Sequence, residues 1–380
     1  MKTHKHRISA ALLSLALIAG ILSSCGVKPT SAPDMAVSSA PKSASTAQTS
    51  EAQKPTKDGV KSFTDSLGRV IELPTDLQRV APSGTLSQIV LYTLAPDRIV
   101  GWTSNPSKEM KKYFDEKYTS LPVFGTFYGK NADLNVEALI AANPQIVIDM
   151  GQIKGEKESM IKDLDELQKQ IGIPVVFIDY YLETTGASYT KLGELLNMPS
   201  EAKKLADYCN VTIKDTKEKV AAIPNDKKVR VYYGEGETGL ETNPAGSFHC
   251  EVLDMAGAVN VVEKSEVIGN NKQISMEQLI QWEPDTIILG PKSIYDTIGK
   301  NPLWKDLSAV KAKHYYEIPS GPYNFVDRPP AVNRIIGVKW LANLLYPEQF
   351  NYDMVKETKE FYSLFYHYEL TDDEAKEILG

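Results

Sequence analysis

The chain has 380 residues, of which 24% are charged and 42% hydrophobic, and its formal net charge is −7 at pH 7. An acidic chain without a dense lysine and arginine stripe is a poor partner for nucleic acid, so we expect no nucleic-acid function. The length exceeds what one hydrophobic core comfortably serves, which predicts two domains. After the amino-terminal residues, no segment is long and apolar enough to cross a bilayer.

The amino terminus has the pattern of an export signal. Three basic residues precede an apolar run, residues 8–22, which is too short to span a membrane. The run ends in Leu-Ser-Ser-Cys, which resembles the bacterial lipobox, in which the cysteine receives a lipid. We therefore predict that residues 1–24 are a lipoprotein signal peptide and that Cys25 is lipidated; the alternative is an ordinary secretory signal. Removing residues 1–24 takes the formal net charge from −7 to −10.

Residues 25–60 differ in composition from the rest of the chain. They are mainly Ser, Ala, Pro, Thr and Lys, with almost no large apolar side chain. Such a segment cannot bury enough apolar surface to offset the entropy lost on ordering, so we predict a disordered tether. With the lipid on Cys25, this places a folded domain at the cell membrane, on its extracytoplasmic face.

Short β-rich runs alternate with helical patterns over residues 61–198. The segment 63–74 alternates apolar and polar residues around Leu67-Gly68, which predicts a β-hairpin. Strands are then expected near Val80, Val100, Ile146 and Val176, and helices over residues 86–94, 136–142 and 156–171. This alternation predicts an α/β lobe with a mostly parallel sheet.

Residues 199–224 have the spacing of one long helix. Pro199 suits its first turn and Pro224 closes it, so the segment is a natural rigid connector. The β-α texture resumes over residues 225–380, with a strand that ends at Gly234. Further on we expect a helix and short strand over residues 246–262, a strand over 314–321, a strongly amphipathic helix over 330–347 and helices over the last thirty residues.

A repeat links the two α/β regions. Residues 133–151 and 273–291 carry the same helix-turn-strand pattern at an offset of 140 residues, and Glu137 in the first copy matches Glu277 in the second. A period of this length indicates duplicated lobes rather than a solenoid. We therefore predict two Rossmann-like lobes joined by the long helix, with the ligand in a cleft between the carboxyl ends of the strands.

This organisation resembles the solute-binding lipoproteins of bacterial ABC importers, in particular the branch that binds ferric siderophores, haem and vitamin B12. The resemblance covers residues 62 to about 347, and the segment 348–380 is longer than the usual end of a member. It implies a monomer that captures an iron-siderophore-type metal chelate and delivers it to a permease dimer with its ATPase. Cobamide, haem and a molybdate-like oxyanion stay open as ligands.

The two matched glutamates have two interpretations. Asn135 and Ser275 can each cap the helix that follows, which puts Glu137 or Glu277 in the first turn, where the helix dipole favours a carboxylate. The resemblance implies instead that both glutamates lie on the outer surfaces of the lobes and pair with arginines of the two permease subunits. We expect docking to be their function.

Ligand contacts are expected in loops that follow strands. Arg328 stands before two prolines that fix the backbone, and its guanidinium suits an anionic group; the alternative is a local salt bridge, for example with Asp327. His249 is a candidate metal or anion ligand, or an ordinary surface or core histidine. Flat rings suit a catecholate, corrin or porphyrin, although tyrosine is common in this chain. The aromatic candidates are Trp102, Tyr128, Tyr180, Tyr181, Tyr233 and Tyr323.

The sequence offers little for catalysis. No HExxH, GxSxG or GxxxxGK[ST] motif occurs, no cysteine pair has metal-binding spacing, and the chain has 5 histidines. We predict no catalytic residue and no cofactor; an extracytoplasmic hydrolase built on carboxylates and a tethered ligand sensor are the alternatives. Cys209 and Cys250 are expected to be free buried thiols, although an exported protein could pair them.

Overall fold

The computed structural model describes residues 59–127, 132–264 and 273–380. The predicted signal peptide, Cys25, nearly all of the tether and Tyr128 lie outside the described residues. We call residues 61–198 the first lobe and residues 225–380 the second lobe.

The first lobe opens with the predicted hairpin. Strands β1 (Val60–Thr64) and β2 (Val70–Pro74) pair antiparallel, which confirms the alternating pattern of the sequence. Gly68 in the connection has a φ of +78°, a conformation that glycine adopts at little cost.

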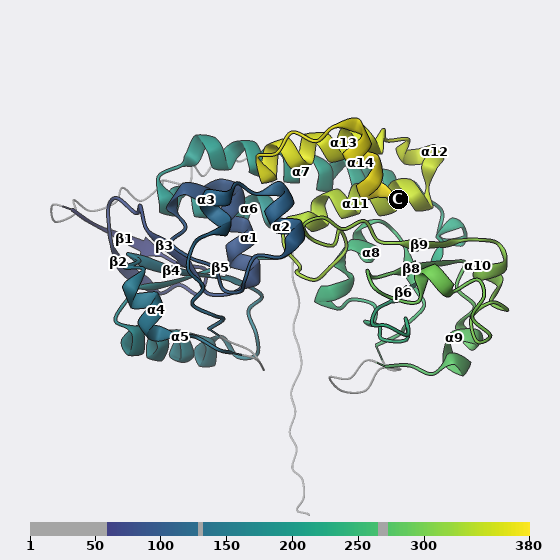
Figure 1. Ribbon diagram of the computed structural model, residues 1–380, viewed down its shortest axis with the longest axis horizontal. Coiled ribbons are helices and arrows are strands. Elements are labelled where there is room, and N and C mark those ends of the chain that lie inside the picture. Colours follow the sequence, from purple (N-terminus) through teal and green to yellow (C-terminus); the bar gives the residue numbers. More distant parts are fainter. Residues whose placement is uncertain (1–58, 128–131, 265–272) are drawn as a thin grey trace, which may run out of the picture. The chain divides into compact units, whose positions relative to one another are not determined.

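A parallel sheet forms the centre of the first lobe. Strands β3 (Val80–Pro82), β4 (Ile146–Gly151) and β5 (Val175–Asp179) lie in the order β3-β4-β5. Its helices are α1 (Thr85–Leu94), α4 (Val136–Ala141), α5 (Lys157–Ile171) and α6 (Thr185–Leu196). Alternate residues of β4 enter different cores, Ile146 and Ile148 with α1 and α6 and Val147 with α4 and α5, so helices cover both faces (Figure 1).

The strand predicted near Val100 does not form a ladder. Only isolated bridges are present, Val80 with Ile99 and Trp102 with Val123. Ile99 pairs with β3, whereas Trp102, three residues later, pairs with the segment around Val123. Because each pairing is a single bridge, no continuous strand results.

The predicted connector is helix α7 (Pro199–Ala221), which has 23 residues and is therefore about 35 Å long. Pro199 occupies its first turn, as expected. The helix contacts α6 of the first lobe and also α8 (Glu251–Met255) and α11 (Asn333–Leu345) of the second lobe. It thus belongs to the packing of both lobes.

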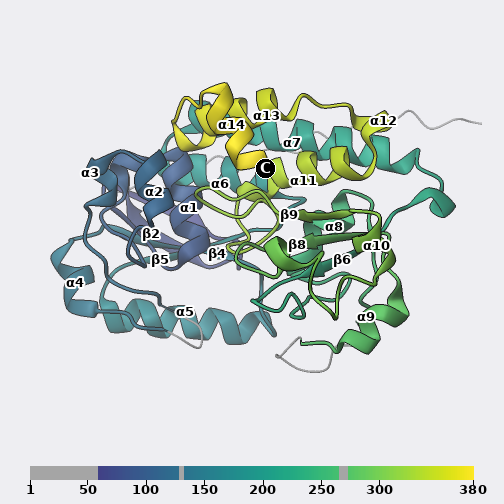
Figure 2. The same cartoon turned by 45° about the vertical axis from the view of Figure 1, so that its right-hand side comes forward.

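The second lobe has a four-stranded parallel sheet in the order β7-β6-β8-β9. Its strands are β6 (Arg230–Gly234), β7 (Val259–Asn260), β8 (Thr286–Leu289) and β9 (Tyr315–Glu317). Helices α9 (Met276–Trp282) and α10 (Ser308–Lys311) contribute to the apolar core on one face, and α8 and α11 to the core on the other (Figure 2). The fold prediction, two α/β lobes with parallel sheets, is confirmed.

The prediction that residues 330–347 form a strongly amphipathic helix is wrong. Almost every residue in the first three turns of α11 is buried, including the polar Asn333 and Arg334. The reason is packing from several sides, because α7, α8, α12 (Pro347–Phe350) and α13 (Met354–Phe361) all contact this helix.

The carboxyl-terminal segment packs back onto the first lobe. It contains α12, α13, a π-helical turn (Tyr362–Tyr366) and α14 (Asp372–Leu379). The Tyr113 and Tyr362 rings lie 5.4 Å apart, and Lys112 pairs with Glu377 at 3.4 Å. The extra length of the chain therefore adds a second connection between the lobes.

Both cysteines of the described region, Cys209 and Cys250, are free and buried, as expected. Burial raises the pKa of the Cys250 thiol to about 12. Within the described ranges, no helix combines the length and hydropathy needed to cross a membrane.

Candidate functional site

Polar side chains gather where strand β6 ends. Glu235 comes directly after Gly234, the last residue of that strand. Around it lie residues from two loops and from the start of a helix. We call this group the polar cluster; its members are Glu235, Asn243, His249, Asp327 and Arg328.

Glu235 is the hub of the polar cluster. Arg328 donates two hydrogen bonds to it, Nε to Oε1 at 2.8 Å and Nη2 to Oε2 at 3.0 Å. The Tyr233 hydroxyl donates to Oε1 at 2.9 Å and Asn243 Nδ2 to Oε2 at 2.5 Å. Although burial by itself raises the pKa of Glu235, the bonds from Arg328, Tyr233 and Asn243 hold it below its ordinary value. The carboxylate is thus charged, and both of its oxygens accept hydrogen bonds from neighbouring side chains.

The Arg328 side chain is oriented by Glu235 but remains partly exposed to solvent. Its φ is +49°, an unusual conformation for a residue other than glycine, and its side chain is 55% exposed. Asp327 lies 3.5 Å from Nε, farther than Glu235, so the salt-bridge alternative is realised mainly with a residue 93 positions away. Nη1 makes no hydrogen bond or ion pair with the described residues. An anion can therefore reach this end of the guanidinium while Glu235 orients the other.

His249 is oriented by a buried carboxylate. Its Nδ1 lies 2.9 Å and 3.0 Å from the two oxygens of Asp327, which is fully buried, and the imidazole is 29% exposed. A carboxylate accepts hydrogen bonds, so Nδ1 carries the proton and Nε2 keeps its lone pair in the neutral ring. This is the arrangement in which an imidazole nitrogen binds a metal or accepts a hydrogen bond. Within the described residues, no group of three or more His, Cys, Asp or Glu is placed to hold a metal ion by itself.

Most of the aromatic candidates lie inside the protein. The buried ones are Trp102, Tyr180, Tyr233 and Tyr323. The Trp102 indole donates to the Tyr118 carbonyl at 2.6 Å, and Tyr233 supports Glu235. This placement agrees with the alternative of ordinary core aromatics, and of these four only Tyr233 has a hydrogen bond to a member of the polar cluster among the described residues. Tyr181 is partly exposed, and its hydroxyl accepts a hydrogen bond from the Ile153 amide at 3.2 Å.

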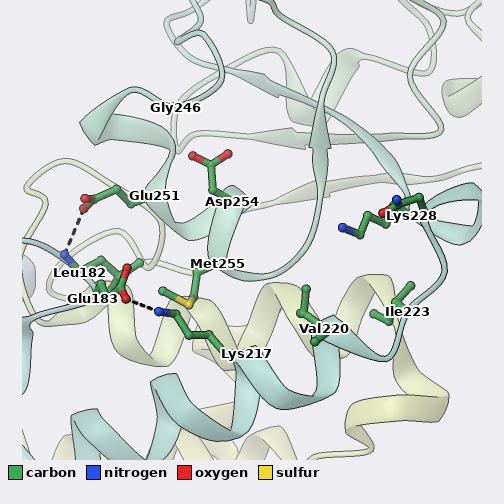
Figure 3. A pocket seen from close by; sticks show the side chains of 12 residues that line it. Leu182, Glu183, Lys217, Val220, Ile223, Lys228, Gly246, Glu251, Asp254 and Met255 are labelled. Carbon is green, nitrogen blue, oxygen red and sulfur yellow. Dashed lines mark hydrogen bonds and ion pairs between the residues drawn. The ribbon is translucent and has the colours of Figure 1, made fainter. Parts of the chain in front are cut away.

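The lobes contact each other beside the polar cluster. Glu251 of the second lobe accepts a hydrogen bond from the Leu182 amide of the first lobe at 3.1 Å (Figure 3). It also accepts one from Arg334 Nη1 at 2.6 Å. Arg334 also donates to the Phe248 carbonyl at 3.1 Å, and its guanidinium carbon lies 4.7 Å from the centre of the Phe248 ring. We did not expect either charged residue from sequence. The available signal was an arginine inside an otherwise apolar run.

Three cavities in the described part of the chain are lined by residues from both lobes: one of about 460 Å³ lies between α1, α7 and the carboxyl-terminal segment, and two are larger. One, of about 550 Å³, lies against α7 and contains Asp254, whose pKa is raised by burial, and the ion pair of Glu183 with Lys217 (Figure 3). The other, of about 690 Å³, is lined by residues that follow β8 and β9, by Ser107 and Glu109 of the first lobe and by the chain terminus. This last cavity lies where ligands of parallel sheets bind, outside the carboxyl ends of strands.

The repeated helices begin as the sequence predicts. Asn135 accepts from the Ala138 amide at 2.9 Å, and Ser275 accepts from the Gln278 amide at 3.2 Å. The Gln278 side chain accepts from the Ser275 amide at 2.9 Å, which confirms the capping box. Glu137 and Glu277 are the second residues of α4 and α9, and both are exposed.

The repeat continues into the backbone at the ends of these helices. Asn143 and Glu283, which are 140 positions apart, both have left-handed conformations, with φ of +50° and +44°. No ion pair involves Glu137 or Glu277 in the part of the chain that the structure describes. Both carboxylates are therefore available to a partner.

Comparison with known proteins shows that the sequence of this chain is similar to those of binding proteins. The family described as periplasmic binding protein matches residues 82–322, more than half of the chain. The molybdate-binding protein MolA of Haemophilus influenzae is 24% identical over 340 residues, which cover 82% of this chain and 93% of that protein. The Fe(3+)-citrate-binding protein YfmC of Bacillus subtilis is 25% identical over 244 residues, covering 62% and 74%. The heme uptake protein IsdE of Staphylococcus aureus is 26% identical over 238 residues, covering 59% and 76%.

Solved structures have the same fold. An ABC transporter solute binding protein from Sulfurospirillum deleyianum superposes with a TM-score of 0.75 at 29% identity, covering 83% of this chain and 98% of that one. A molybdate-bound structure of MolA from Haemophilus influenzae gives a TM-score of 0.65 at 22% identity, covering 82% and 99%. The similarity extends over both lobes.

Proposed function

Because the chain belongs to the periplasmic binding protein family, we propose that it captures an iron-siderophore-type metal chelate outside the cytoplasm and delivers it to an ABC importer. Its broader role, a solute-binding protein for metal-related ligands and not an enzyme, rests on the family and on relatives that bind molybdate, iron citrate and haem. The choice of a siderophore-type chelate is our proposal.

The polar cluster carries this proposal. Arg328 offers an exposed, rigidly held guanidinium, and His249 offers an imidazole nitrogen beside it. A guanidinium binds carboxylate or catecholate oxygens through directed hydrogen bonds, and such oxygens are what a metal chelate displays. Because Glu235 follows β6, both groups lie at the carboxyl end of a parallel sheet, where ligands of such sheets bind.

A ligand screen tests the proposal. The mature protein, purified from its own host, is examined by native mass spectrometry for a retained ligand. Isothermal titration then compares ferric siderophores, haem, cobalamin and molybdate, with Arg328→Ala as the control that lacks the guanidinium. Binding of a ferric siderophore that weakens in the control supports the proposal. Failure of every ferric chelate to bind, with another ligand bound, refutes the siderophore assignment.

A molybdate-like oxyanion is the second candidate. The specific observation in its favour is that Trp102, Tyr180, Tyr233 and Tyr323 are buried, which leaves fewer aromatic faces for a large planar ligand. A small tetrahedral anion needs only directed donors, which Arg328 supplies. In the same titration, binding of molybdate without binding of ferric chelates decides for this candidate.

We also propose that the protein is attached to the membrane through a lipid on Cys25 and docks on the permease through Glu137 and Glu277. The support for docking is that both carboxylates are exposed at matched positions of the two lobes. In a reconstituted importer, Glu137→Ala and Glu277→Ala should each slow transport at matched ligand occupancy while leaving ligand affinity unchanged. Wild-type transport by the double variant would refute docking through these residues and leave the helix dipole as the reason for a glutamate at each position.

A further inference from the structure

Each repeated helix exposes an isoleucine at the matched position. Ile140 of α4 is 56% exposed and Ile280 of α9 is 51% exposed. They are 140 residues apart, the same offset that relates Glu137 to Glu277. The repeat thus conserves an apolar surface residue as well as an acidic one within this chain.

The isoleucine and the glutamate of each helix share one face. Residues three apart on a helix are neighbours, with about 5–6 Å between their Cβ atoms. The opposite side of each helix is anchored by Leu139 or Leu279, and both leucines are fully buried. The lobe therefore holds each helix so that the glutamate-isoleucine pair faces solvent.

The stability of the two helices does not require an exposed isoleucine at the matched position of each. Single exposed apolar residues are normal on protein surfaces. The same residue at the same step of two separate helices, each time beside a carboxylate that makes no ion pair among the described residues, is a repeated surface. A repeated surface suits a partner that presents two equivalent faces.

The second lobe adds a shallow groove beside its isoleucine. The groove has a volume of about 130 Å³, and its apolar wall includes Leu303, which is 60% exposed. Its apolar lining is Ile280, Pro284, Leu303 and Leu307, and its acidic lining is Glu283 and Asp306. Asp306 pairs with Lys311 at 3.3 Å, whereas Glu283 makes no ion pair among the described residues. An apolar lining beside such a carboxylate is complementary to an apolar side chain that stands beside a basic one.

We propose that Ile140 and Ile280 are apolar contacts of the permease, each one helical turn from its docking glutamate, and that the groove beside Ile280 receives an apolar side chain of the permease. The partner surface has two equivalent faces, each with a basic side chain next to an apolar one. This inference rests on the proposed function, because it requires docking on an importer. It adds the part of the docking surface that does not depend on charge.

The test measures docking of the full-length protein on its permease-ATPase complex in lipid nanodiscs. The variants are Ile140→Gln, Ile280→Gln and their combination, because glutamine keeps the helix propensity and similar length and removes the apolar surface. The matched control is Val211→Gln on α7, a residue 67% exposed and outside both repeated helices. Each variant is compared at low and at high salt with Glu137→Ala and Glu277→Ala.

Each isoleucine variant should weaken docking about five- to ten-fold, since a half-exposed isoleucine gains about half the transfer free energy of a fully exposed one. The loss should persist at high salt, whereas the loss from the glutamate variants should shrink. The Val211 control should dock like the wild type.

Three results overturn the inference. Wild-type docking by the double isoleucine variant, while the glutamate variants dock poorly, refutes the apolar contact and leaves the proposed function standing. No docking of the wild-type protein on its importer refutes both. A self-association of the wild-type protein that the isoleucine variants abolish, seen by sedimentation, assigns the surface to a second copy of this chain instead.

Discussion

Replacing Arg328 by alanine tests the polar cluster most directly. In the free protein the substitution removes two hydrogen bonds to Glu235, at 2.8 and 3.0 Å. Charge-assisted bonds of this kind are strong when buried, but this arginine side chain is 55% exposed, so water screens the pair. We therefore expect the free energy of unfolding to fall by only about 1 kcal/mol.

Ligand binding should respond more strongly than stability. A charge pair buried by a bound anion is worth about 2–5 kcal/mol when one partner is truncated. Because the Arg328 guanidinium also binds Glu235, we expect the lower part of that range, about 2 kcal/mol. This corresponds to a dissociation constant roughly thirty-fold larger. Arg328→Lys keeps the charge and loses the paired donors, so it should fall between the wild type and the alanine variant.

Isothermal titration with the ligand found in the screen measures this effect, and urea unfolding checks that the variant is folded. Glu235→Gln completes a double-mutant cycle and gives the coupling of the two residues in the free protein. An unchanged dissociation constant for a folded Arg328→Ala protein would refute the ligand role and leave Arg328 as a partner of Glu235 alone.

The remaining predictions concern stability and location. Arg334→Met should lower the free energy of unfolding by about 3 kcal/mol, because Glu251 loses its buried partner but is itself 25% exposed; an unchanged urea midpoint would contradict this. Glu235 has a pKa lowered from 4.5, so its contribution to stability is present above pH 4.5 and is lost as the pH falls through the folded value. Urea midpoints measured against pH should therefore fall less steeply below pH 4.5 in Glu235→Gln, and parallel curves for the variant and the wild type would argue against it. Cys25→Ser should release the protein from the membrane fraction, and retention at the wild-type level would exclude the lipid anchor.

Local sequence patterns correctly predicted the helix caps, the hairpin and the start of the connecting helix. The caps at Asn135 and Ser275, the hairpin at Gly68 and the start of α7 at Pro199 all formed as expected. Each depends on backbone preferences and hydrogen bonds within a few residues, which the sequence displays directly. The repeat predicted two lobes, because the same local pattern implies the same unit twice.

Burial could not be predicted in the same way. The aromatic residues that follow strands were expected to face the ligand, yet Trp102, Tyr180, Tyr233 and Tyr323 are enclosed. Helix α11 reads as amphipathic but is surrounded by other helices. Whether a side chain after a strand faces solvent depends on which distant segments cover it, and spacing along one segment does not contain that information.

The sequence by itself determined the lobes, the connecting helix and the paired glutamates, because these follow from local periodicity and from self-similarity. Only the tertiary structure decided the partners within the candidate site. Arg328 and Glu235 are 93 positions apart, and Arg334 and Glu251 are 83 apart. Each pair meets because strands, loops and α11 of the second lobe pack together. Contacts between charges so distant along the chain are set by the packing of whole elements, which no single segment specifies.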